Sequence, residues 1–311
     1  FGQWQFKFNA TDTVNFTDQT TNNPFNLTQR NLTFQLQSGN SSVVHRVTNT
    51  SSLGVKFVDA VDSAQDIGTG VTGTLYVTTD GGAISYLSGG SNTSLNGIVR
   101  RAFDPTCSWQ VGPQSWKIES AATSCYYSVN STVYNISIIT DAPNNTIVSP
   151  VSGTCYVPGA SIILNSTVRD ECSGIASATV SATVRQGASS SVCGSTTDLL
   201  TGNYSCVWNS AGRSYGLYNL TVNSSKQYYA NASNTSLDSL RLAAVPELND
   251  PRVNVGVDGW GVKRTFNITV RDPSGDTINV SLWVKPNNSN IWQFRGSQLC
   301  PSCSTYTNLT F

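Results

Sequence analysis

The chain has 311 residues, of which only 12% are charged, and its formal net charge is zero, so its length allows two to three domains. It carries no basic patch and no acidic run, and its composition therefore gives no support for binding nucleic acid. No stretch approaches about 18 consecutive apolar residues, so we expect no membrane span in this chain.

The first predicted element is an amphipathic strand in FGQWQFKFNATD. Trp4, Phe6 and Phe8 alternate with polar residues, which is typical of a strand that buries one face. The stretch lines up with GLYNLTVNSSK at 216–226, which we expect to be the closing strand of a complete module. The chain is therefore predicted to open with a closing strand, and we expect residues 1–42 to form this donor strand and a linker.

A repeat of about 100 residues organises the rest of the chain. NSTVRDECSG at 165–174 recurs as NITVRDPSG at 267–275, and a looser copy lies at 56–77. Short alternating strands between Gly, Asn and Ser turns predict an all-β fold of tandem immunoglobulin-like β-sandwich domains. We expect complete domains at 43–142 and 143–250, and an open domain at 251–311 that lacks its closing strand.

The first complete domain holds the main candidates for catalytic or metal chemistry. His45 is the only histidine of the chain, and we expect it to be an ordinary strand residue, because nucleophilic catalysis needs a positioned base. Asp59, Asp62 and Asp66 offer oxygen atoms for calcium, but their spacing matches no EF-hand loop, so a solvated turn is the preferred interpretation. We expect no enzymatic activity, no metal site and no cofactor.

The second complete domain has the most regular strand pattern. Strands are expected in SIILNSTVRD, ASATVSATVRQ, NYSCVWN and YGLYNLTVNSS. Tyr204 stands two residues before Cys206, as in the tyrosine corner of immunoglobulin-like domains.

The last domain contains only the early strands of the repeat, and it complements the opening strand. If the last domain of one copy is followed by the opening strand of another copy, the two segments together make about one module length. We therefore predict a subunit interface in which Trp4, Phe6 and Phe8 complete the last domain of a neighbour, a head-to-tail strand donation. Two alternatives stay open: the chain is a window from a longer array of such domains, or the match between amphipathic strands is accidental.

Eight cysteines are expected to form disulfides in an oxidising compartment. They come as near neighbours along the sequence: Cys107 and Cys125, Cys155 and Cys172, Cys193 and Cys206, and Cys300 and Cys303. The connectivity stays open, with a bond between Cys155 and Cys206 as an alternative. Zinc is disfavoured because there is one C-x-x-C motif and one histidine.

The N-x-[ST] sequon occurs 20 times, where the composition would give about seven by chance. This excess predicts a heavily N-glycosylated extracellular surface. The candidate sites are Asn9, Asn15, Asn26, Asn31, Asn40, Asn49, Asn92, Asn130, Asn135, Asn144, Asn165, Asn203, Asn219, Asn223, Asn231, Asn234, Asn267, Asn279, Asn287 and Asn308. The chain contains no Met, so we expect that a signal peptide has been removed or that the chain is a piece of a longer protein.

The stretches TIVSPVSGTCYVPGASIILNSTVRDECSGI and TGNYSCVWNSAGRSYGLYNLTV resemble the tandem immunoglobulin-like domains of archaeal surface glycoproteins, including surface-layer proteins. The resemblance covers the chain at the level of its modules and implies a secreted, glycan-coated structural role. The predicted junction also resembles, in geometry, archaeal thread-type filaments and bacterial chaperone–usher pili. The chain departs from type IV pilins, whose first residues form a long apolar helix.

These features together predict a structural subunit of an N-glycosylated extracellular filament at the cell surface. Its partners would be further copies of itself and its covalent N-linked glycans. The first alternative is a surface-layer protein or another tandem-domain glycoprotein of the cell envelope. The second is an adhesin that recognises glycans or another cell.

Overall fold

The computed structural model describes residues 2–63, 67–81, 85–254, 259 and 261–311, which form strands and turns without an α-helix. No helix in this part of the chain is long and apolar enough to cross a membrane. The chain divides into two compact units. The first comprises residues 1–142, 170–172 and 226–230, and the second comprises residues 143–169, 173–225 and 231–311.

The first unit contains a β-sandwich of two sheets. The smaller sheet has the strand order β10-β7-β5 and the larger sheet the order β6-β12-β11-β8-β9, with β6 and β12 parallel. Alternate residues of both sheets fill the core, where Phe57, Trp116 and Ile138 are fully buried. The strands are β5 (Leu32–Ser38), β6 (Ser42–His45), β7 (Ser51–Asp59), β8 (Thr72–Thr78), β9 (Tyr86–Thr93), β10 (Ile98–Phe103), β11 (Gly112–Ser120) and β12 (Tyr134–Ile139).

The second unit contains a sandwich that repeats this topology. Its sheets have the orders β13-β15-β19-β18 and β14-β21-β20-β16-β17, again with one parallel pair, β14 and β21. The strands are β13 (Asn144–Ser149), β14 (Thr154–Tyr156), β15 (Ser161–Arg169), β16 (Thr179–Gln186), β17 (Ser189–Val192), β18 (Thr197–Asp198), β19 (Asn203–Asn209), β20 (Gly216–Ser225) and β21 (Ala232–Leu242). These two sandwiches are the tandem immunoglobulin-like domains that the repeat predicted.

The second unit also contains the last sandwich, which is smaller. Its sheets have the orders β22-β23-β26 and β24-β25. Among the described residues its second sheet therefore has two strands, where the second sandwich has five. The strands are β22 (Glu247–Val253), β23 (Phe266–Arg271), β24 (Ile278–Val284), β25 (Gln293–Cys300) and β26 (Thr307–Thr310), and they occupy the places of β13, β15, β16, β17 and β19.

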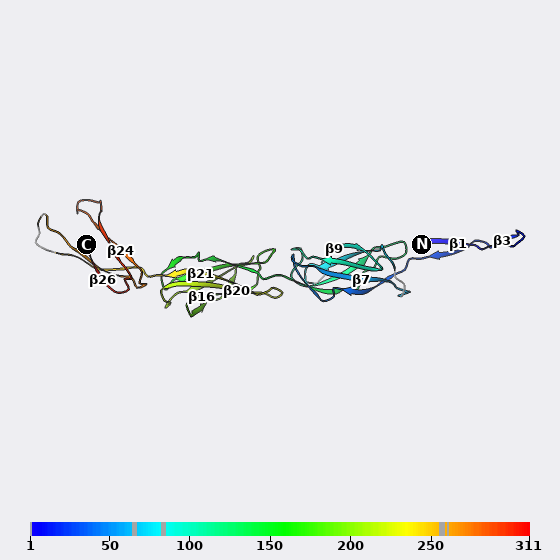
Figure 1. Ribbon diagram of the computed structural model, residues 1–311, viewed down its shortest axis with the longest axis horizontal. Helices are drawn as coiled ribbons and strands as arrows, with labels where there is room; N and C mark the ends of the chain where they lie inside the picture. Colours follow the sequence, from blue (N-terminus) through cyan, green and yellow to red (C-terminus); the bar gives the residue numbers. More distant parts are fainter. Residues whose placement is uncertain (1, 64–66, 82–84, 255–258, 260) are drawn as a thin grey trace. The chain divides into compact units, whose positions relative to one another are not determined.

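The segment expected to be a linker contains strands. β1 (Gly2–Phe6) pairs antiparallel with β4 (Asn23–Leu27), and β2 (Asn9–Thr11) pairs with β3 (Thr17–Gln19), so these four strands form one long hairpin (Figure 1). After the hairpin comes β5, an edge strand of the first sandwich whose Leu32 is buried in the core. The first sandwich therefore starts near residue 32 and not at residue 43.

The repeated sequence motif marks one turn in all three sandwiches. In each, an aspartate at or directly after the end of an inner strand (β7, β15 or β23) accepts a hydrogen bond from the amide two residues later. The donor–acceptor pairs are Val61 and Asp59, Cys172 and Asp170, and Ser274 and Asp272, each at 2.8 Å. Such a side-chain bond fixes a tight turn at the strand end, which explains why the motif recurs.

Candidate assembly site

The aromatic face that the sequence predicted comprises Trp4 and Phe6 of β1 and Phe8, two residues after the end of β1, and that face is uncovered. Trp4, Phe6 and Phe8 have exposed fractions of 53%, 45% and 69%. The rings of Phe6 and Phe8 lie edge to face with their centroids 5.7 Å apart. Covering such side chains stabilises by roughly 1.5–3 kcal/mol each, so this face is a strong apolar binding surface.

The equivalent strand of the second sandwich, β20, buries the same three positions. Tyr218, Leu220 and Val222 have exposed fractions of 5%, 1% and 1%. Both strands also start with a glycine in the same backbone conformation, with φ of +121° at Gly2 and +125° at Gly216. Only glycine adopts this φ readily, so the two strands share a structural start as well as an apolar pattern.

The last sandwich has an open groove of about 410 Å³ between its sheets. Its apolar lining consists of Leu248, Pro251, Val253, Phe266, Ile268, Val280, Leu282 and Phe311. In the second sandwich, Leu220 and Val222 of β20 line a cavity of only about 10 Å³ together with residues of β15 and β16, the counterparts of β23 and β24. The groove therefore lies where the closing strand lies in a complete sandwich.

One edge of β24 is unpaired within the described part of the chain. Its counterpart β16 has a neighbour on each side, β17 and β20, whereas β24 pairs only with β25. An unpaired edge offers backbone N–H and C=O groups to an incoming strand. The groove and the edge together thus offer apolar contacts and ladder hydrogen bonds to one added element.

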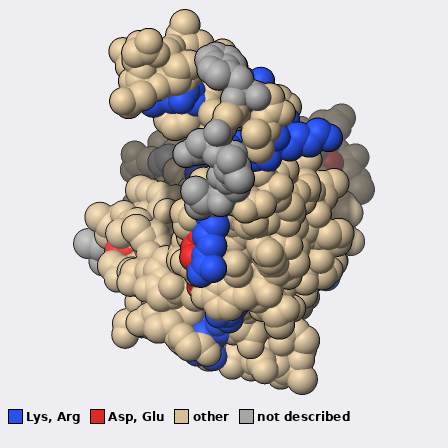
Figure 2. Space-filling view, turned by 90° about the vertical axis from the view of Figure 1, so that its left-hand side faces the viewer, with Lys and Arg blue, Asp and Glu red and all other residues tan. Residues whose placement is uncertain are grey.

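Charge contributes little at this end of the chain. Figure 2 views the molecule from the side on which Figure 1 labels β24 and β26, and most of that face is uncharged, with scattered Lys and Arg side chains. We therefore expect apolar burial and backbone pairing, more than ion pairs, to drive any association here.

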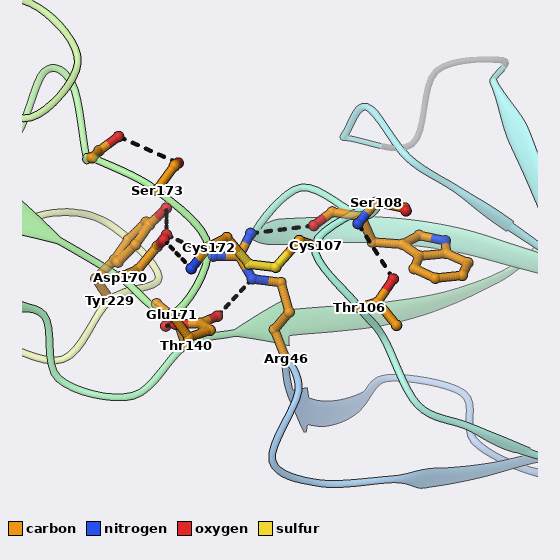
Figure 3. The surroundings of a disulfide bond; sticks show 12 residues. Arg46, Thr106, Cys107, Ser108, Thr140, Asp170, Glu171, Cys172, Ser173 and Tyr229 are labelled. Carbon is orange, nitrogen blue, oxygen red and sulfur yellow. Dashed lines mark hydrogen bonds and ion pairs between the residues drawn. A yellow bond between two sulfur atoms is a disulfide. The ribbon is translucent and has the colours of Figure 1, made fainter.

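A buried ion-pair cluster surrounds a disulfide of the first unit (Figure 3). Arg46 bonds to Asp170 and to Glu171, each at 2.6 Å. Burial alone would lower the pKa of Arg46, but its hydrogen bond to Glu171 and the two negative charges raise the pKa on balance. The cluster holds the turn 170–172 in the first unit, next to Cys107, and its role is structural.

The disulfides differ from the near-neighbour pairing at half of the cysteines. Cys193–Cys206 and Cys300–Cys303 form as expected, whereas Cys107 bonds to Cys172, and Cys125 and Cys155 are free and exposed. The reason is tertiary: the turn 170–172 packs in the first unit and brings its cysteine to a Cα distance of 5.6 Å from that of Cys107. The alternative bond between Cys155 and Cys206 does not form either.

The asparagines of the sequons lie at the surface. Sixteen of the 20 are exposed, and the other four, Asn165, Asn203, Asn219 and Asn267, are half-buried. Asn145, which starts no sequon, is by contrast buried and donates to the carbonyl of Val222 at 3.1 Å. The sequon positions are thus accessible to glycan attachment, which stays a prediction.

The candidates for catalysis or metal binding take part in structural contacts. His45 ends β6, and its Nδ1 lies 2.9 Å from a carboxylate oxygen of Asp141 at the surface. Backbone amides of the following turn donate to Asp59 and lower the pKa of its carboxyl. Asp66 lies outside the described residues, within which no group of three His, Cys, Asp or Glu side chains is placed to hold a metal ion.

Tyr204 makes the contacts expected of a tyrosine corner. Its buried hydroxyl donates to the carbonyl of Ile175 at 2.7 Å and accepts from the amide of Ala178 at 2.8 Å. Burial raises the pKa of this phenol. The side chain thereby fastens the loop before β16 to β19, as the pattern with Cys206 indicated.

No protein-family model matches the sequence, and no curated protein matches it either. Among solved structures, the chain is similar to a tetra-tandem repeat from the extending region of a large adhesion protein, with 14% identity, a TM-score of 0.41, and coverage of 100% of this chain and 72% of the other. It is also similar to the domains IG1 and IG2 of DIP-gamma (8% identity, TM-score 0.35, coverage 68% and 97%). A third similar structure holds fibronectin(III)-like modules of Clostridium thermocellum CbhA (12% identity, TM-score 0.26, coverage 67% and 92%). Likeness at this level says nothing about function.

Proposed function

We propose that this protein is a structural subunit of an N-glycosylated extracellular filament, assembled head to tail by strand donation. In this assembly β1 of one subunit adds to the free edge of β24 in the next, and the aromatic face of β1 fills the open groove. The partner of the chain is a second copy of itself, and no catalytic chemistry is involved.

The observation that carries the proposal is the match between an uncovered face and an unfilled groove. Trp4 and Phe6 on β1, and Phe8 just after it, are exposed, while the corresponding positions of β20 close the second sandwich. Full burial of three large side chains from water contributes roughly 5–9 kcal/mol. Because these three are 45–69% exposed, covering them would contribute about half of that before backbone hydrogen bonds are counted. The donor surface and the acceptor groove are different parts of the subunit. A growing assembly therefore always keeps one free donor strand and one free groove, and the contact propagates into an open polymer.

The accessible sequons and the disulfides support an extracellular setting for this polymer. Glycans on so many surface asparagines would keep a chain with few charges solvated. Disulfides persist in oxidising compartments, where they add to the stability of each sandwich.

Deletion of residues 1–12 tests the proposal most directly. We expect the deleted protein to remain a soluble monomer, whereas the intact chain polymerises under the same conditions, as seen by electron microscopy and sedimentation. A matched pair of variants refines the test: Trp4→Asp places a charge on the aromatic face of β1, and Gln3→Asp places it on the polar face. Filaments of normal length from the Trp4→Asp protein would contradict the proposal.

The mass of the natural polypeptide distinguishes the filament from a tandem-domain envelope glycoprotein. A deglycosylated chain near 33.3 kDa, the mass of these 311 residues, favours strand exchange between subunits. A much larger chain would favour a surface-layer or related envelope protein, in which further domains follow covalently.

A second candidate function is glycan or cell adhesion, which exposed aromatic side chains of the last sandwich favour. The rings of Trp283 and Phe294 lie edge to face with their centroids 5.3 Å apart, and both are exposed together with Trp292. Aromatic rings of this kind suit stacking on sugars. Binding of soluble monomer to a glycan array, and its loss in the Trp283→Ala variant, would support this function over the structural one.

A further inference from the structure

We infer that the donated element is the whole β1–β4 hairpin, so that each subunit contributes two strands to the last sandwich of a second copy. This inference rests on the proposed function, since it specifies what is donated. It differs from donation of β1 alone, because it assigns the residues of β4 to the same interface.

The pairing at the start of the hairpin matches that of the closing hairpin in both complete sandwiches to within one residue. Gly2 pairs with Leu27, 25 residues later. The equivalent Gly216 pairs with Leu242, 26 residues later, and Gly112 of β11 pairs with Ile138 of β12 at the same separation. The glycine has a φ between +121° and +125° in all three hairpins. The strands β1 and β4 therefore correspond to β20 and β21, or to β11 and β12, as a pair.

The strand β4 contributes its own apolar side chains to the uncovered face. Phe25 pairs with Trp4 across the hairpin, so their side chains lie on one face, and Phe25 and Leu27 are 41% and 46% exposed. The corresponding residues of β21, Leu240 and Leu242, are completely buried. A single donated strand would leave the apolar residues of β4 in water, whereas donation of the hairpin covers both strands.

The opposite face of the hairpin is polar and carries a sequon. Asn26 pairs with Gln3, and Pro24 pairs with Gln5, so these side chains lie away from the aromatic face. A glycan on Asn26 would therefore point away from the groove and leave the apolar face free. The hairpin is thus two-sided, as expected for an element that covers one face of a sandwich and exposes the other.

The groove has a side that the second strand would cover. Besides β24, its lining includes Leu248 and Val253 of β22. In the second sandwich the counterpart of β22 is β13, and β13 is in contact with β21, the counterpart of β4. Strand β1 on the edge of β24 would cover only the part of the groove next to β24. The part next to β22 would be covered by β4, because its counterpart β21 contacts β13, the counterpart of β22.

The chain that leaves the hairpin makes the same contact as the chain that leaves β12. Arg30, three residues after Leu27, forms an isolated parallel bridge with Tyr126 in the loop between β11 and β12. Thr140, two residues after Ile138, forms the same kind of bridge with Tyr229 in the loop between β20 and β21, and both bridges belong to the first unit. The hairpin is therefore followed by a junction of the kind that follows a complete sandwich.

These correspondences predict the register of the added strands. Leu220 pairs with Val184 of β16, and TVSATV of β16 lines up with NVSLWV of β24, so that Val184 corresponds to Val284. Phe6, which takes the place of Leu220, is therefore expected opposite Val284 of the second copy. Phe8 is then expected opposite Leu282, which lines the groove.

Aspartate substitutions in the full-length chain test the inference. Phe25→Asp puts a charge on the apolar face of β4, and its control Pro24→Asp puts the same charge on the polar face of the same strand. We expect Phe25→Asp to raise the protein concentration needed for polymerisation by at least about tenfold, as Trp4→Asp does, and Pro24→Asp to leave it nearly unchanged. The unfolding temperature of the monomer should be the same for the unmodified chain and for the Trp4→Asp, Phe25→Asp and Pro24→Asp variants, because the apolar face of the hairpin is exposed before assembly.

The outcomes separate the inference from the proposed function. If Trp4→Asp blocks polymerisation and Phe25→Asp does not, a single strand is donated, and the inference is overturned while the proposed function stands. If Pro24→Asp blocks it as strongly as Phe25→Asp, the interface does not follow the apolar face, which also overturns the inference. If neither Trp4→Asp nor Phe25→Asp has an effect, or the unmodified chain does not polymerise, both are overturned.

Discussion

The second and the last sandwich share one framework, but the described part of the last sandwich has no counterpart of β14, β18, β20 or β21. Strands β22 to β26 repeat the first strands of the second sandwich, and the aspartate turn recurs with the same hydrogen bond. The second sandwich also has the hairpin β20–β21, and Leu220 and Val222 of β20 line a cavity of only about 10 Å³, whereas the last sandwich has a groove of about 410 Å³. One amphipathic hairpin thus accounts for two of the three strands by which the second sheets of the closed and the open domain differ.

The largest expected effect contrasts equivalent positions of β20 and β1. Leu220→Ala should lower the free energy of unfolding of the second sandwich by about 2–5 kcal/mol, because it leaves a cavity in a packed core. Phe6→Ala should change the stability of the monomer by less than about 0.5 kcal/mol, because the side chain is exposed. Urea denaturation of the monomeric proteins measures both. Equal losses of stability would mean that the face of β1 is covered within its own subunit.

A second effect concerns the disulfide that fixes the turn of the second repeat. Cys172→Ser should lower the free energy of unfolding by about 2–4 kcal/mol, because the bond closes a loop with a sequence separation of 65 residues. Cys125→Ser serves as the control, since this cysteine is free and exposed. Differential scanning calorimetry under non-reducing conditions would reveal the difference. A loss in the control as large as in Cys172→Ser would contradict the observed pairing.

A third effect concerns the tyrosine corner of the second sandwich. Tyr204→Phe removes a hydroxyl that bonds to the backbone of Ile175 and Ala178, and we expect a loss of about 1–3 kcal/mol. Because burial raises the pKa of Tyr204, this phenol should also resist ionisation at a pH where exposed tyrosines titrate. Spectrophotometric titration and chemical denaturation report the two effects. The matched variant Tyr215→Phe, at an exposed tyrosine, should be neutral.

The smallest expected effect is a loss of stability of the first sandwich at acidic pH, to which Asp59 contributes. Its pKa is lowered in the folded state, so its carboxylate stabilises the fold above its unfolded pKa of about 3.9, and the stabilisation is lost as the pH falls below that value. Asp59→Asn should therefore flatten the decline of the unfolding temperature on the acid side. If the unfolding temperature of the Asp59→Asn variant fell as steeply with acid as that of the unmodified chain, this role for Asp59 would be ruled out.

The sequence predicts the elements that have strong local patterns. Alternation of Trp4, Phe6 and Phe8 locates the opening strand, and the recurring TVRD motif locates the aspartate turns. Tyr204 before Cys206 indicates a tyrosine corner that the structure contains. These features depend on residues close together in the chain, so their spacing alone carries the information.

The sequence does not predict features that depend on distant partners. The strand β4 lies in NPFNL, where a proline and a sequon surround Phe25 and Leu27, and its role becomes evident only from its pairing with β1. The bond between Cys107 and Cys172 depends on the folded position of the turn 170–172. Near-neighbour spacing is a poor guide to such a bond, because topology decides which cysteines meet.

The disulfide between Cys107 and Cys172 has a consequence for a chain under tension. In the proposed filament, a pull on both ends would reach every subunit in series, and the force would pass directly between these two residues. The segment between them, with a sequence separation of 65 residues, could not unfold into an extended chain under this force. The maximum extension of the subunit would therefore be shorter by about 220 Å, at roughly 3.4 Å per residue. This disulfide would limit how far a filament under tension lengthens before it breaks.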